Sequence, residues 1–121
     1  MVVPVPVQQQ IVAQAPALAY APSQLPAGWR FSSWFTTGSM LEIVFRRAGG
    51  GEVDFFVYRF RGPCSSGSLG KIGGVFWTRT VARPSAWRCV DGRKLVADLF
   101  PAERLSQPAL LRFIASVRRL N

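Results

Sequence analysis

The stretch EVDFFVYRFRG, residues 52–62, alternates two kinds of side chain and is the clearest strand in the sequence. Alternate residues form its two faces, with Asp54, Phe56, Tyr58 and Phe60 on one face and Phe55, Val57, Arg59 and Arg61 on the other. Successive side chains of a strand point to opposite faces, so one face is aromatic beyond its acidic start and the other changes from apolar to cationic. The stretch therefore predicts a strand in a sheet that packs on a core.

Further strands are expected on both sides of this stretch. Alternation or strand-forming composition appears in GWRFSSWFTTG, GVFWTRTVA, WRCV and KLVADLF, at residues 28–38, 74–82, 87–90 and 94–100. A turn is expected over residues 83–86, and Asp91-Gly92 is a hairpin signal. These strands and turns complete the expected antiparallel sheet.

Residues 39–48 can be interpreted as a helix or as a strand. Ser39 and Glu42 have the spacing of a helix capping box, and Gly49 would stop such a helix. The run 43–45, Ile-Val-Phe, instead favours a strand, and AGGGE after it suits a hairpin. The sequence leaves both open, although the short link to residue 52 favours the strand.

The C-terminal segment has helical spacing. Pro108 stands where a first helical residue would, and one face then collects Leu110, Phe113, Ile114, Val117 and Leu120. We therefore expect an α+β fold, in which a small antiparallel β-sheet of about five strands is packed by a C-terminal amphipathic helix.

Residues 1–27 differ from the rest of the chain because they are uncharged and rich in proline, glutamine and alanine. This composition favours extended geometry, so we expect an N-terminal arm or linker ahead of one basic domain over residues 28–121. Such an arm would contact a neighbouring protein subunit. Prolines interrupt its apolar stretch, so no transmembrane segment is expected.

The charge balance points to an anionic partner. The chain has 15 basic and 6 acidic residues, a formal net charge of +9, and all of that charge follows residue 29. Arginine next to aromatic residues suggests a face that neutralises phosphates and stacks on bases. The candidate nucleic-acid-binding residues are Arg30, Arg46, Arg47, Arg59, Arg61, Arg79, Arg88, Trp34 and Tyr58. The alternative is a plain solvated face, with the aromatic residues in the core.

Recognisable catalytic and cofactor motifs are missing from the sequence. The chain has no histidine, which leaves no Ser-His or Cys-His pair and makes a metal site improbable. The loop GPCSSGSLGKIGG at 62–74 resembles a phosphate-binding loop, but Ser65 and Ile72 occupy the positions where a Walker sequence needs glycine and a hydroxyl residue. We therefore expect no enzyme, no metal, no cofactor and no small-molecule substrate.

Two cysteines, Cys64 and Cys89, leave the compartment open. Free thiols would suit the cytoplasm or a virion-like particle, whereas a disulfide would place the protein in the periplasm or outside the cell. The leading hypothesis is a structural assembly subunit whose Arg/aromatic face meets nucleic acid in a nucleoprotein particle. The alternatives are a disulfide-bearing component of bacterial envelope or secretion machinery, and a free-standing single-stranded nucleic-acid-binding protein.

Overall fold

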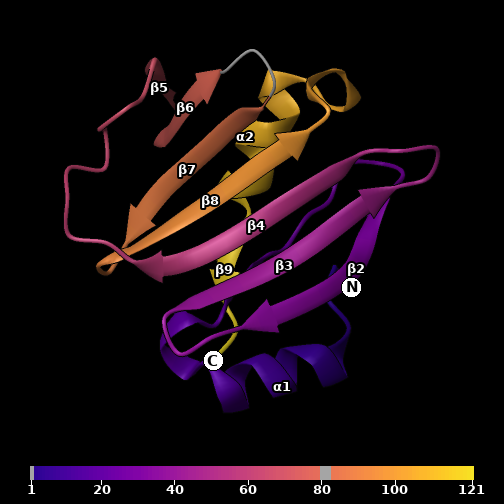
Figure 1. Cartoon of the computed structure of the whole chain (residues 1–121), viewed down its shortest axis with the longest axis vertical. Coiled ribbons are helices and arrows are strands. Elements are labelled where there is room, and N and C mark those ends of the chain that lie inside the picture. Colours follow the sequence, from indigo (N-terminus) through magenta and orange to yellow (C-terminus); the bar gives the residue numbers. More distant parts are fainter. Residues whose placement is uncertain (1, 80–82) are drawn as a thin grey trace.

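The computed structural model describes residues 2–79 and 83–121, which form a seven-stranded antiparallel sheet, a two-stranded sheet and two α-helices (Figure 1). The large sheet has the strand order β2-β3-β4-β8-β7-β6-β5. Its strands are β2 (Trp29–Thr36), β3 (Met40–Arg47), β4 (Glu52–Arg59), β5 (Gly70–Ile72), β6 (Val75–Arg79), β7 (Pro84–Val90) and β8 (Arg93–Phe100).

The expected small sheet of about five strands is wrong, because the fold is mostly β with seven strands in one sheet. One of the additional strands, β5, lies in the glycine-rich loop and pairs with β6 across Gly73 and Gly74. Both glycines have positive φ, at 57° and 80°, as a two-residue type I′ hairpin turn requires.

The other strand predictions have mixed outcomes. Residues 40–47 are strand β3, so the helical alternative for residues 39–48 is wrong. The hairpin at Asp91-Gly92 is confirmed between β7 and β8. The turn expected over residues 83–86 is wrong, because β7 already begins at Pro84. The end of the strand expected over residues 74–82 lies outside the described residues from position 80.

A C-terminal helix, α2 (Gln107–Ala115), lies across one face of the sheet. Ser106 caps its start by accepting a hydrogen bond from the Ala109 amide at 3.3 Å. Phe113 packs edge-on against Phe45 of β3 and Phe55 of β4, with ring centroids 5.5 and 6.2 Å apart. The helix is shorter than predicted because the chain extends again at β9 (Val117–Arg119), which pairs with β1 (Tyr20–Pro22).

The expected extended N-terminal arm is wrong. Residues 5–14 form helix α1 (Val5–Gln14), and η1 (Pro16–Leu18) and β1 follow it. Prolines 4 and 6 stand at the helix start, where a missing N–H costs nothing. The segment buries Val3, Ile11, Ala15, Leu18, Ala19, Tyr20 and Ala21 in the same hydrophobic cluster as the sheet and α2.

Long-range hydrogen bonds fix this N-terminal segment to the C-terminal one. Ser23 donates from its hydroxyl to the Ser116 carbonyl at 2.6 Å, and the Leu120 amide donates to the Ala19 carbonyl at 2.8 Å. Residues 2–23 are therefore a structural part of the fold.

The large sheet has two different faces. We call the face covered by α2 and the N-terminal segment the helix side, and the opposite one the open face (Figure 1). Side chains of Leu41, Phe45, Phe55, Leu95 and Ala97 on the helix side are fully buried. Within the described residues, neither helix has the length and apolar character needed to cross a membrane.

Candidate functional site

Three of the nine predicted binding residues lie on the open face. Arg30 and Arg46 sit directly opposite each other on β2 and β3. Tyr58 is also on this face, but the β3–β4 register places it next to Met40, at the other end of β3 from Arg46. These residues therefore do not form one compact cluster.

The remaining predicted residues lie elsewhere. Strand alternation puts Trp34 and Arg47 of β2 and β3 on the helix side, because they pair with the buried residues Ile43 and Trp29. Arg59, Arg79 and Arg88 also belong to the helix side, and Arg61 lies in the loop after β4. The structure therefore divides the nine residues between two faces and a loop.

Arg88 forms hydrogen bonds with backbone carbonyls inside the protein. Its guanidinium donates from Nη2 to the Val117 carbonyl at 2.6 Å and from Nε to the Ile114 carbonyl at 3.2 Å. The Ile114 carbonyl belongs to the last turn of α2, and the Val117 carbonyl belongs to β9 directly after the helix. Burial, with the nearby positive charge of Arg118, lowers the pKa of Arg88. We conclude that Arg88 ties α2 to the sheet.

Sequence reasoning missed a group of carboxylates on the open face. Four of the six acidic residues lie there, and Asp54 of β4 pairs directly with Asp98 of β8. The others, Glu42 and Glu52, lie on β3 and β4. A sequence signal for this group existed, because these acidic residues occupy the strand positions that alternate with buried apolar residues. Among the described residues, no group of three or more is arranged to hold a metal ion.

Asp54 is the most perturbed of these carboxyls. Burial raises its pKa to about 7, and the negative charges of Glu52, Glu42 and Asp98 add to that effect. Hydrogen bonding to Asp54 lowers the pKa of Glu52, which makes Glu52 the more acidic of the two carboxyls. In the described part of the chain, Oδ1 of Asp54 is buried and has no hydrogen-bond partner.

Cations and aromatic rings surround the carboxylates. Arg46 forms an exposed ion pair with Glu52 at 3.2 Å, and Lys94 lies over the rings of Phe60 and Trp87 at 5.0 and 4.8 Å. Phe35 and Phe100 are about half exposed, at 54% and 52%. The open face is therefore of mixed charge, with exposed aromatic rings among its charged groups.

The excess positive charge lies outside the open face. Only two carboxylates, those of Asp91 and Glu103, are found away from that face. The arginines that oppose them with exposed side chains include Arg104, Arg112, Arg118 and Arg119. A long-range attraction for anions is therefore expected from the side of α2 and β9.

The two cysteines form the disulfide Cys64–Cys89, with their Cα atoms 6.1 Å apart. The bond holds the loop after β4 over Trp87 of β7, which is only 4% exposed although it lies on the open face. The indole donates from Nε1 to the Cys64 carbonyl at 2.7 Å and stacks on Phe76. The sequence left free thiols and a disulfide as alternatives, and the structure contains the disulfide.

No protein-family model matches this chain, and no curated protein is significantly similar to it.

Proposed function

We propose that this chain is a non-enzymatic binding domain that works in an oxidising compartment, the periplasm or the cell surface. The observation that carries the proposal is the Cys64–Cys89 disulfide. Disulfides form and persist in oxidising compartments and are rare in the cytosol, where thiols are kept reduced. This favours the envelope alternative over the nucleoprotein particle.

The disulfide also shapes the open face, which we take as the partner-binding surface because it combines charged groups with exposed aromatic rings. It joins the loop after β4 to β7, and that loop covers Trp87, which stacks on Phe76, at one end of the open face. Without the bond, the loop would be held by hydrogen bonds alone, those of Phe60 to Gly92, Trp87 to Cys64 and Leu69 to Trp77, each worth about 1 kcal/mol. An oxidising environment thus keeps this end of the open face in one shape.

Subcellular fractionation of the source organism tests the proposal. We expect the protein in the periplasmic, surface or extracellular fraction, where protease added to intact or outer-membrane-permeabilised cells reaches it. A periplasmic or secreted protein and a cytoplasmic one serve as matched controls. Recovery together with the cytoplasmic control, protected from protease, would contradict the proposal.

A nucleic-acid-binding function is the second candidate, either within a nucleoprotein particle or as a free-standing protein. The exposed arginines near α2 and β9 favour it, because few carboxylates oppose them. Binding of a labelled single-stranded oligonucleotide is measured by anisotropy over a salt series. The second candidate predicts that the logarithm of the affinity falls steeply with the logarithm of the salt concentration. It also predicts that Arg112→Glu weakens binding more than Arg30→Glu on the open face does. Absence of binding at low salt would eliminate it.

A further inference from the structure

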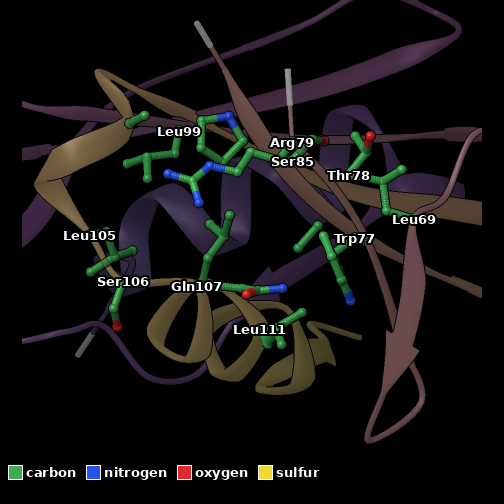
Figure 2. A pocket seen from close by; sticks show the side chains of 14 residues that line it. Leu69, Trp77, Thr78, Arg79, Ser85, Leu99, Leu105, Ser106, Gln107 and Leu111 are labelled. Atoms are coloured by element: carbon green, nitrogen blue, oxygen red, sulfur yellow. The ribbon is translucent and has the colours of Figure 1, made fainter. Parts of the chain in front are cut away.

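A cavity of about 510 Å³ lies between the start of α2, the segment before it and the adjoining ends of β6 and β7 (Figure 2). Small-molecule sites commonly measure about 300–1,000 Å³. The cavity lies beside α2, and its described lining residues include none of the open-face carboxylates, although Ser85, which lines it, donates to Asp98 Oδ1 at 2.7 Å.

The floor of the cavity is hydrocarbon. Leu99 of β8, Ala86 of β7, and Leu110 and Leu111 of α2 line it, and all four are buried from solvent. Leu69 also lines the cavity and is 63% exposed. Such walls favour an apolar group over water.

The polar groups of the cavity are mainly cationic or neutral donors. Figure 2 shows the Arg79 side chain extending towards Leu99, and Gln107 of α2 turned towards Trp77. Within the described part of the chain, the Arg79 guanidinium has no hydrogen-bond or ion-pair partner. Among the described residues that line the cavity, none carries a carboxylate. An unpaired guanidinium beside apolar walls favours an anion with a planar or tetrahedral set of oxygens.

We propose that this cavity binds a small amphipathic anion, a monoacyl chain that ends in a carboxylate or phosphate. The acyl chain lies on Leu99, Leu110 and Leu111, and the head group accepts hydrogen bonds from Arg79 and Gln107. The chemistry is common to a free fatty acid and to an anionic lipid, and the experiment below separates these two sources.

A second, smaller cavity gives the acyl chain room to continue. It measures about 330 Å³ and shares Gln107 and Leu111 with the first cavity as walls. Ile72 of β5 lines it and is 55% exposed. The ligand site does not depend on the compartment or on the disulfide, so its failure would leave the proposed function untouched.

The test is a titration of the ¹⁵N-labelled full chain with decanoate, followed by NMR. The Trp77 indole N–H reports on the cavity, and the spectrum of Trp77→Phe assigns its signal. We expect a saturable shift of this signal, and no comparable shift of the signals from Trp29, Trp34 and Trp87. Decanol, which has the same chain without the charge, should bind more weakly.

Two variants and one control test the roles of the charge and the cavity. Arg79→Glu should weaken decanoate binding by about tenfold or more, because it removes a charge-assisted hydrogen bond. Ala102→Phe should weaken decanoate and decanol alike, because Ala102 lines the cavity and a ring there would fill it. Arg61→Glu carries the same charge change on a distant loop and should bind as the unchanged protein does. Well-dispersed amide signals establish that each variant is folded.

Sedimentation with phosphatidylglycerol vesicles distinguishes the two sources of the ligand. Binding that Arg79→Glu abolishes would identify a membrane lipid, whereas binding of decanoate alone would identify a free acid, and either supports the proposal. An unchanged Trp77 signal together with no vesicle binding would overturn it. Equal decanoate affinity in Arg79→Glu would overturn it as well.

Discussion

Replacing Cys64 and Cys89 by serine should remove a large part of the stability of this fold. The two residues are 25 positions apart, and closing a loop of that length restricts the unfolded chain by about 3.5 kcal/mol in the chain-entropy model. Domains of this size have a total unfolding free energy of about 5–15 kcal/mol. The double variant should therefore be folded but only marginally stable.

Part of the effect should be local to the open face. Once the bond is lost, the loop after β4 is free to leave Trp87, which is otherwise only 4% exposed and bonded to the Cys64 carbonyl. We expect the Trp87 indole to become exposed to solvent before global unfolding, and its emission maximum to shift to longer wavelength. The variant Trp87→Phe identifies the contribution of this indole to the emission spectrum.

Urea unfolding followed by circular dichroism measures the loss. The oxidised protein, Cys64→Ser, Cys89→Ser and the double variant are compared at one pH, and the three variants should agree closely. Ser65→Ala in the same loop keeps the bond and should stay within about 0.5 kcal/mol of the unchanged protein. A difference below about 1 kcal/mol between the oxidised protein and the double variant would refute the reasoning.

Three further predictions follow from the described contacts. The pKa of Asp54 in the folded protein is about 7, above its ordinary value of 3.8. The protonated carboxyl therefore contributes its full stabilisation of the fold below about pH 3.8, and that stabilisation is lost as the pH rises through 7. Asp54→Asn should therefore lessen the fall in stability between pH 4 and 7 seen by thermal unfolding, and an unchanged pH profile would contradict this. Arg88→Met should destabilise the fold by about 2–3 kcal/mol in urea, since two carbonyls lose a charged donor, whereas the exposed Arg47→Met should change stability by less than about 0.5 kcal/mol. Deleting residues 1–22 should abolish cooperative unfolding, because it removes Ile11 and Tyr20 from the core; a truncated chain with an unchanged melting curve would restore the arm hypothesis.

The strands that the sequence predicted well are those with strong local alternation. Strand β4 shows it over eight residues, and Asp91-Gly92 marks the turn into β8. Strand β5 was missed although Gly73-Gly74 between Ile72 and Val75 is itself a hairpin signal. The glycines before it made the whole stretch look like an irregular loop.

Long-range packing explains the errors at the N-terminus. Prolines and glutamines favour extended chain locally, and helix α1 is only weakly amphipathic, with Ile11 its one buried residue. Its position depends on the pairing of β1 with β9, almost a hundred residues later. No local pattern in residues 1–27 carries that information.

The candidate site failed for a similar reason. Sequence alternation shows that two side chains share a face of one strand, but not which face α2 will cover. It also does not show that β4 pairs with β8, which places Asp54 opposite Asp98, 44 positions further along the chain. Without that pairing, arginines on five strands were assigned to one surface, although the structure divides them between two faces.

The state of the two thiols in the native organism tests the central claim most directly. Cells are quenched in acid, the protein is denatured with an alkylating reagent and no reductant, and its mass is measured. We predict an intact Cys64–Cys89 bond, seen as a mass without alkyl groups that gains two only after reduction. Protein that carries two alkyl groups before reduction would contradict the account.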